Sequence, residues 1–390
     1  MTTVMSKPQG GKSETEVLAP SPELSVLSTD MEWPTDTIDI MIGLLTLNNA
    51  GSIEAVLKSI VEGMRQFFPH ASALLVNCDA GSQDDTPGLI TRLTDGVIPL
   101  RIVSNAAGSY GHLMREPGFP GRDESIRNFC LTAQRLRPKI CLILEGQLRS
   151  LNPSWIDHLG RPVYEQGEDY VVPLYRRHRY EGTLATNLLY PLTRALYGKR
   201  LRYPSGGAYA LSGKFAGDVI SRPTWRGPAA KYSVDSRLTT AALAGGYRVC
   251  HTCLGTRDQE STLGAVDLSV LIAQSVGGIF HSMEAYESSW EAIKASNEVP
   301  LYGEPESAPD PGPLHTGRMV SGFKQGLRDL LPLWELILSR DTVGQIIALD
   351  IQDPEEFRFP PALWVHTVYD FALAYHNQTL HREHMLKALT

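Results

Sequence analysis

The order of hydrophobic and polar positions predicts alternating strands and helices in the first 150 residues. Continuous apolar runs, typical of parallel strands buried on both faces, alternate with segments whose apolar residues repeat at helical spacing. The expected strands are 37–48, 71–79, 97–105 and 139–144, and the expected helices are 52–68, with Ser52 as N-cap, and 124–136. This alternation is typical of a Rossmann-like α/β fold with a mostly parallel sheet and right-handed crossovers.

The second half of the chain continues this alternation and then becomes helical. We expect a strand at 169–178, a helix at 181–198, a glycine-rich loop and short strand at 205–213, a helix and strand at 233–255, and a long helix at 267–293. Residues 303–314 are rich in proline and predict a linker. From residue 317 onward the pattern is helical, most clearly at 363–376, which indicates a helical C-terminal extension.

Composition divides the chain into a tail and a folded region. Residues 1–36 are rich in Ser, Thr, Pro, Glu and Gly without periodicity, so we expect a disordered tail. Residues 37–150 and 151–300 are expected to be two halves of one α/β domain, because the strand pattern runs through both. Residues 301–390 are expected to form the linker and the helical C-terminal region.

Charge and hydropathy argue against two classes of protein. The formal net charge is −7, whereas nucleic-acid-binding domains are usually basic, although a local basic pocket remains compatible with this value. The chain has no run of 18 apolar residues, so no membrane insertion is expected. The N-terminus lacks the basic-then-apolar pattern of a signal peptide. The expected compartment is therefore the cytoplasm.

The cysteines and the C-terminal histidines do not predict a metal site. Cys250 and Cys253 form a C-H-T-C motif, but it lies inside an expected strand and lacks a second ligand pair at zinc spacing. His381 and His384 have H-x-x-H spacing without a third placed ligand. We interpret the first pair as core residues and the second as part of a helical surface.

Four stretches, in order and spacing, carry a resemblance to a known family. They are GLLTLNNAGSIEAVL (43–57), VNCDAGSQDDT (76–86), LILEGQLRSLNPSWI (142–156) and the segment from YRRHRYEGTL to SGGAYALSG (175–213). Together they resemble the GT-A nucleotide-sugar glycosyltransferases of the mannosylglycerate synthase and glucosyl-3-phosphoglycerate synthase type, over about residues 38–390. The resemblance implies a GT-A fold whose first half binds the sugar donor and whose second half binds the acceptor.

The candidate donor-binding residues follow the ends of expected strands, where α/β sheets bind ligands. They are Leu45, Thr46, Asn48, Asp79, Arg122 and Gly146. The resemblance implies that Asp79 contacts the base and ribose, and the alternative is that it only shapes a polar turn. Arg122 stands where the family has a lysine, and a cation near a helix N-terminus suits a diphosphate. Asp123 replaces a family glycine and adds a negative charge there.

The resemblance also implies a divalent metal, but two of its ligands are altered. The family's Asp-x-Asp motif, which binds Mg²⁺ or Mn²⁺, is here Glu145-Gly146-Gln147. The family histidine corresponds to Gln259, with Asp258 beside it as a possible substitute. Hard cations prefer anionic oxygen ligands. The sequence therefore predicts that no metal is bound, or that one is bound weakly by Glu145 and Asp258. Arginines, with Arg122, Arg149, Arg257 and 176–179 as candidates, would then balance the diphosphate charge.

The candidate acceptor-binding residues are basic side chains and a glycine-rich loop. They are Arg176, Arg179, Ser205, Gly206, Gly207 and Tyr209, and together they suit an anionic acceptor. The alternative for the arginines is a solvated charged surface. The resemblance places Asp235 near the reaction centre, where it would orient acceptor or sugar hydroxyls. The candidate catalytic residues are thus Glu145, Gln147 and Asp235.

Two functions from different classes fit these residues. The first is a retaining glycosyltransferase that moves a sugar from a nucleoside-diphosphate sugar to a small anionic acceptor with little or no metal dependence. The second is a pseudoenzyme that binds nucleotide sugars without turnover. A dinucleotide-dependent oxidoreductase is disfavoured because no G-x-G-x-x-G follows the first strand. The resemblance further implies a homodimer.

Overall fold

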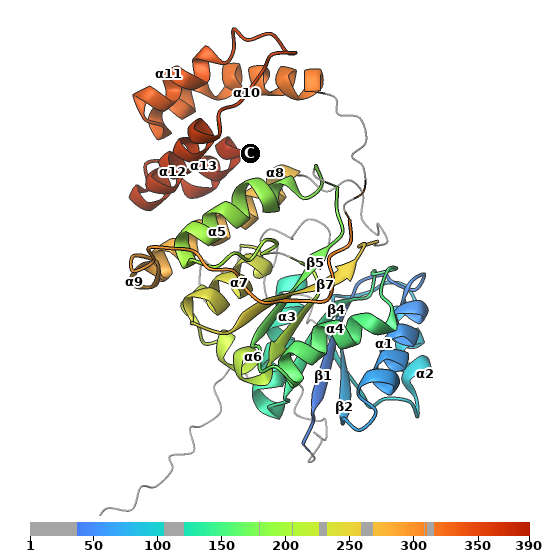
Figure 1. Ribbon diagram of the computed structural model, residues 1–390. Helices are drawn as coiled ribbons and strands as arrows, with labels where there is room; N and C mark the ends of the chain where they lie inside the picture. The colour runs from blue at the N-terminus through green and yellow to red at the C-terminus, as the bar shows by residue number, and fades with distance from the viewer. Residues whose placement is uncertain are drawn as a thin grey trace, which may run out of the picture. The chain divides into compact units, whose positions relative to one another are not determined.

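One mixed sheet organises the protein. The computed structural model describes residues 37–104, 121–178, 180–204, 206–225, 232–258, 268–307, 309 and 316–390; the expected tail, 1–36, lies outside them. The strands are β1 (Ile40–Thr46), β2 (Ala73–Asp79), β3 (Leu100–Ser104), β4 (Ile140–Glu145), β5 (Tyr170–Tyr175), β6 (Tyr209–Ser212), β7 (Val249–Gly255) and β8 (Leu301–Tyr302). Their order is β3-β2-β1-β4-β6-β5-β7-β8, and β6 runs antiparallel to both neighbours. Figure 1 labels β1, β2, β4, β5 and β7 of this sheet. The predicted α/β class with a mostly parallel sheet is confirmed.

Helices cover both faces of this sheet. The helices on one face are α1 (Ile53–Phe67), α2 (Thr86–Thr94) and α4 (Pro153–Tyr164), and those on the other are α3 (Arg122–Leu136), α6 (Gly213–Val219) and α7 (Val234–Ala244). Ile42 and Leu44 belong to the core under α1 and α4, whereas Gly43 faces the opposite layer. A Cβ atom at Gly43 would lie 2.6 Å from the Phe129 ring of α3, so glycine permits that helix to pack closely on β1.

Three local features before β5 differ from the sequence prediction. Helix α2, at Thr86–Thr94, was not expected, because its start lies in a turn-rich stretch. Ser52 precedes α1 as expected, but its hydroxyl makes no cap hydrogen bond and donates instead to the Gly146 carbonyl, at 2.7 Å. Helix α4 was not predicted, because Gly160 and Pro162 interrupt its pattern. It begins at Pro153, where a missing N–H costs nothing, and Asn152 caps it by accepting from Ser154 N.

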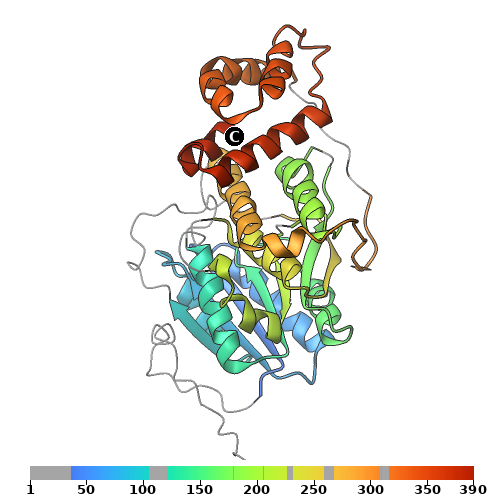
Figure 2. The same cartoon turned by 90° about the vertical axis from the view of Figure 1, so that its left-hand side faces the viewer.

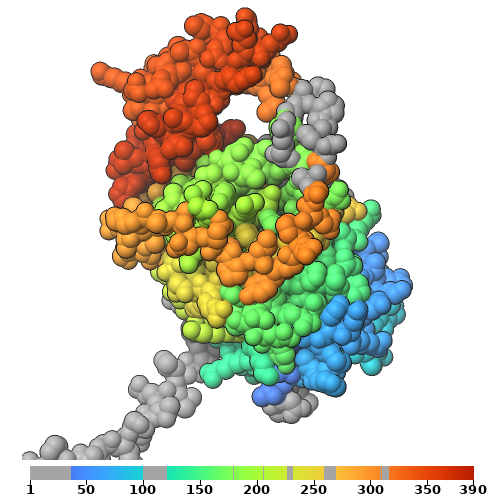
Figure 3. Space-filling view, in the orientation of Figure 1, coloured from blue at the N-terminus to red at the C-terminus, as the bar shows by residue number. Residues whose placement is uncertain are grey.

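The helix expected at 181–198 consists of a π-helical segment followed by an α-helix. A π-helical segment (Ala185–Leu189) precedes α5 (Tyr190–Tyr197), and Gly198 ends α5 in the left-handed conformation. The wide turns come just before Pro191, which lacks the N–H needed to continue the regular hydrogen-bond ladder. The segment after α9 (Glu287–Trp290) returns past Gly198 to form β8 beside β7, and it is seen as an orange band in Figure 3.

The predicted helical C-terminal extension is present. Its helices are α10 (Thr316–Ile337), α11 (Arg340–Ala348), α12 (Pro361–Asn377) and α13 (Arg382–Leu389), and they share an apolar core with α5 and α8 (Leu268–Ala285) (Figures 1 and 2). The Tyr375 and Tyr232 hydroxyls lie 2.8 Å apart, which links α12 to the residues before α7. None of the helices in the described part of the chain combines the length and hydropathy that a membrane span needs.

Candidate functional site

The carboxyl edge of the sheet brings several predicted site residues together. Strand β1 lies between β2 and β4, and the connection order reverses there, which is where α/β sheets open a ligand crevice. The strand register pairs Thr46 with Asp79 and Leu45 with Glu145. The structure thus places residues from three separate strand ends next to one another, as the strand pattern predicts.

The Asp79 carboxylate is occupied by its own turn. Oδ2 accepts from the backbone N–H groups of Gly81 (3.0 Å) and Ser82 (2.9 Å), and Oδ1 accepts from the Ser82 hydroxyl (2.6 Å). The Thr46 hydroxyl lies 3.1 Å from Oδ1 and 2.9 Å from Asn77 Oδ1, so the two oxygens share its one hydrogen. A carboxylate has about four acceptor positions, so the turn itself uses three of them. The geometry favours the turn-shaping alternative over base recognition by this side chain.

The residues at the end of β1 differ in how far their side chains are buried. Leu45 is fully buried, whereas Asn48 is exposed with a φ of +53°, and its Oδ1 accepts from Gln83 N. A Cβ atom at Gly146 would lie 2.9 Å from Asn49 Oδ1. The sequence prediction missed Asn49, whose buried Nδ2 has no hydrogen-bond partner among the described residues and remains available as a donor.

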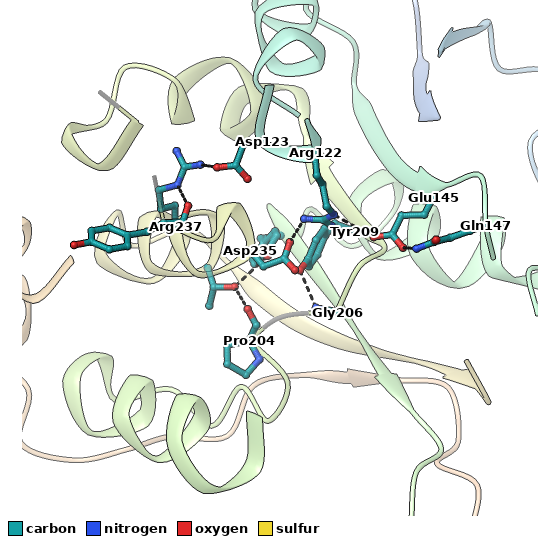
Figure 4. A network of polar contacts seen from close by, with 12 residues as sticks. Arg122, Asp123, Glu145, Gln147, Pro204, Gly206, Tyr209, Asp235 and Arg237 are labelled. Atoms are coloured by element: carbon teal, nitrogen blue, oxygen red, sulfur yellow. Dashed lines mark hydrogen bonds and ion pairs between the residues drawn. The ribbon is translucent and has the colours of Figure 1, made fainter. Parts of the chain in front are cut away.

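Glu145 is the centre of a buried charge network (Figure 4). Its Oε1 accepts from Arg122 Nε at 3.1 Å, and its Oε2 accepts from Arg257 Nη2 at 3.0 Å and Gln147 Nε2 at 3.1 Å. Arg122 Nη1 also donates to Asp235 Oδ1 at 2.5 Å. Two of the three predicted catalytic residues therefore contact each other directly, and Arg122 bridges them to the third.

Electrostatics keep Glu145 ionised although it is buried. Burial acts to raise the pKa of this carboxyl, but the charges of Arg257 and Arg122, with hydrogen bonds from Gln147 and Arg122, outweigh it and hold the pKa below its ordinary value. The pKa of Arg257 is raised in turn: burial opposes its charge, and Glu145 more than compensates. The site therefore holds a permanent carboxylate between permanent cations at neutral pH.

A second ion pair lies next to this network, since Asp123 follows Arg122 in the chain. Arg237 of α7 pairs with Asp123 of α3, and its Nε donates to the Tyr232 carbonyl at 3.1 Å. Burial raises the pKa of Asp123 despite the charges of Arg237 and Arg122. Asp123 thus joins α3 to α7 through its pair with Arg237.

The described residues do not fit a Mg²⁺ or Mn²⁺ ion. Both oxygens of Glu145 are held by guanidinium groups, Gln147 contributes a neutral amide, and Asp258 is exposed with its backbone bonded to Ser150. No group of three His, Cys, Asp or Glu side chains suited to a metal occurs within the described ranges. Gln259 lies outside them. The arrangement instead supplies fixed positive charge from arginine.

The glycine-rich loop supports the network. Gly206 N donates to the Tyr209 hydroxyl at 2.7 Å, and the buried Tyr209 ring stacks on Tyr170 at 5.5 Å between centroids. Gly207 has a φ of +76°, and a Cβ atom there would lie 2.6 Å from Arg257 Nη2. Glycine at 207 therefore makes room for the Arg257 guanidinium, which the resemblance alone did not indicate.

The remaining predicted acceptor residues are less central. Arg176 Nε donates to the Ser307 carbonyl at 2.8 Å, and its Nη1 lies 3.7 Å from Glu306 Oε2. This side chain therefore contacts the loop after β8. Arg179 and Ser205 lie outside the described residues. The sequence indicated Arg177 only as one member of the basic stretch 176–179, yet this more buried side chain lies over the Tyr175 ring at the end of β5.

Comparisons with known proteins give weak structural likenesses. No family model matches the sequence, and a search of curated proteins finds no match. Among solved structures, glucosyl-3-phosphoglycerate synthase from Mycobacterium tuberculosis, in complex with Mn²⁺, UDP-glucose and phosphoglyceric acid, is 22% identical, with 67% of this chain and 88% of that chain covered and a TM-score of 0.45. S. aureus TarS 1–349 is 13% identical, with 64% and 66% covered and a TM-score of 0.39. At these values the likeness carries no argument about donor, acceptor or metal.

Proposed function

We propose that this protein transfers a sugar from a nucleoside-diphosphate sugar to a small anionic acceptor without requiring a metal. The observation that carries the proposal is the convergence of Arg122 and Arg257 on the buried Glu145 at the carboxyl edge of β4. A departing diphosphate needs preorganised positive charge, and arginine supplies it in a geometry that matches phosphate oxygens. The sequence resemblance in four ordered stretches supports the same class of reaction.

Each residue at the centre has a role that its contacts permit. Glu145 holds the two guanidinium groups in place, and Gln147 donates to Glu145 without adding charge. Asp235, with its side chain 17% exposed, keeps one carboxylate oxygen for orienting an acceptor or sugar hydroxyl. Donor contacts by the backbone around Asn48 and by the Asn49 amide remain part of the proposal.

Two further features of the proposal rest on the sequence resemblance. Retention of anomeric configuration is one, and NMR of the product anomer would test it. A homodimer is the other, and light scattering of the purified chain would test it. Both are independent of the charge network.

Titration calorimetry with UDP-sugars and GDP-sugars tests the proposal, first in EDTA and then with Mn²⁺. We expect binding in EDTA, followed by sugar transfer to small carboxylate or phosphate acceptors. Gln147→Asp should weaken binding in EDTA and make it partly Mn²⁺-dependent, because two adjacent carboxylates favour a divalent cation. Gln166→Asp, at an exposed position before β5, is the matched control.

The possible results separate the two candidate functions. Binding with neither transfer nor donor hydrolysis would support the pseudoenzyme. Binding by wild type only when Mn²⁺ is present would contradict a metal-independent site. The absence of binding to any nucleotide sugar would reject both functions.

A further inference from the structure

Two arginines at the carboxyl ends of β5 and β7 lie over the same aromatic ring. The Arg177 guanidinium carbon is 5.4 Å from the Tyr175 ring centroid, and that of Arg257 is 5.8 Å from it. Arg177 also lies 5.0 Å from the Tyr203 ring. Planar guanidinium groups stack on aromatic faces and keep their N–H donors free at the edges.

These side chains present donors that the protein leaves unused. Arg177 Nε, Arg257 Nε and the Tyr175 hydroxyl are buried, and within the described part of the chain none has a hydrogen-bond partner. Buried polar groups are normally satisfied, so an unused cluster of this kind points to a ligand. The ligand must accept hydrogen bonds from several directions.

The charge balance specifies the sign of that ligand. Arg122, Arg177 and Arg257 contribute three positive charges at this edge, whereas Glu145 and Asp235 contribute two negative charges. Arg177 Nε lies 3.9 Å from Glu181 Oε1, beyond hydrogen-bond distance, and the Glu181 side chain is 48% exposed. Burial and the neighbouring charge of Arg257 lower the pKa of Arg177, as expected for like charges held close together. An anion would relieve this repulsion.

The surrounding residues fix the position of Arg257. Glu145 accepts its Nη2, and Gly207 leaves the space that the guanidinium fills. Arg257 is therefore held rigidly by a carboxylate on one side and by backbone on the other. A preorganised cation of this kind loses little entropy when it binds a phosphate oxygen.

We propose that Arg257 and Arg177, with the Tyr175 hydroxyl, form a built-in phosphate-binding site that takes the donor diphosphate in place of a divalent cation. This inference rests on the proposed function for the identity of the ligand, but the site itself is defined by its own chemistry. Glu145 and Gly207 are positioning residues, since they act through Arg257. The site would recognise a diphosphate by charge and fork geometry and would require no metal.

Calorimetric titration of the full chain with inorganic pyrophosphate in EDTA, at constant ionic strength, tests the site independently of base and sugar. We expect Arg257→Ala and Arg177→Ala each to weaken binding at least 10-fold, and Arg257→Lys to have a smaller effect. Gly207→Ala should weaken binding without changing any charge, because its Cβ displaces Arg257. Arg248→Ala is the control, since Arg248 precedes β7 at the opposite edge and is 62% exposed; binding should stay within 2-fold of wild type.

The outcomes distinguish this inference from the proposed function. Pyrophosphate binding that Arg257→Ala weakens, in a chain that binds no nucleotide sugar, would keep the phosphate site and reject the transferase. Nucleotide-sugar binding without pyrophosphate binding, or binding that needs Mn²⁺ and ignores both arginines, would overturn the site. Circular dichroism of each variant establishes folding, and if an alanine variant unfolds, Arg257→Lys and Gly207→Ala still decide the matter.

Discussion

Removing the charge of Glu145 should destabilise the protein through the arginines that it holds. In Glu145→Gln the side chain keeps its shape, but Arg257 loses the carboxylate of Glu145, and Arg122 loses that carboxylate while keeping its pair with Asp235. The Glu145 and Arg122 side chains are 4% and 6% exposed, so water cannot solvate the guanidinium that has lost its partner. Breaking a buried pair costs about 3–5 kcal/mol. Because Arg257 is 21% exposed and partly hydrated, we expect about 2–4 kcal/mol here.

Urea unfolding at pH 7.5 in EDTA, followed by circular dichroism, would measure this loss. The double variant Glu145→Gln/Arg257→Gln should regain about 1–2 kcal/mol relative to the sum of the single variants, since the partners are coupled. Glu168→Gln is the matched control: Glu168 is equally buried, but its partner Arg248 is mostly exposed, so the loss should be smaller. A Glu145→Gln variant within about 0.5 kcal/mol of wild type would refute the network.

The contribution of the Glu145 carboxylate to stability should depend on pH. The folded pKa of Glu145 lies below its ordinary value of 4.5, so its contribution to stability is fully present above that pH. The contribution is lost as the pH falls through the lowered folded pKa. Wild type should therefore lose stability in this range more steeply than Glu145→Gln, and the two curves should converge in acid.

Two further changes test the scaffold. Burial lowers the pKa of His251 from 6.5 to about 4, and its Nε2 accepts from Arg202 N. Wild-type stability should thus be complete above pH 6.5 and fall by about 2 kcal/mol between pH 6.5 and 5, a slope that urea unfolding of His251→Gln should lack. Gly43→Ala should cost about 1–3 kcal/mol in the same assay because its Cβ meets the Phe129 ring. The control Gly317→Ala adds its Cβ in open space on α10, and a comparable loss there would contradict this packing argument.

The sequence predicts the sheet better than its covering helices. Strands β1, β2 and β4 are largely continuous apolar runs, because both of their faces are buried, and their short length favours a strand over a buried helix. Helix α4 escaped prediction because Gly160 and Pro162 break its period. Its buried Trp155 and Ile156 hold it on the core all the same, so tertiary packing overrides the local signal.

The sequence likewise predicts one part of the candidate site and not another. That Thr46, Asp79 and Glu145 share an edge follows from strand alternation alone. Which donor meets which carboxylate does not, because Arg257 and Glu145 are 112 positions apart and meet only through the order of the strands. The ligand role that the resemblance implies for Asp79 stays a prediction, and the hydrogen bonds of its own turn compete for the same carboxylate, which strand patterns do not reveal.

Glu145, Gln147 and the arginines make physical sense as one unit. Gln147 Nε2 lies 3.1 Å from Glu145 Oε2, a distance at which an aspartate in its place would repel Glu145 unless a cation lay between them. Here the guanidinium of Arg257 is that cation, and it needs one carboxylate, not two. A neutral amide satisfies Glu145 and leaves its charge for the arginines. A carboxylate at position 147 would instead compete for the positive charge of Arg257, which the proposed diphosphate ligand would need, so we expect the amide at 147 and the arginine at 257 to depend on each other.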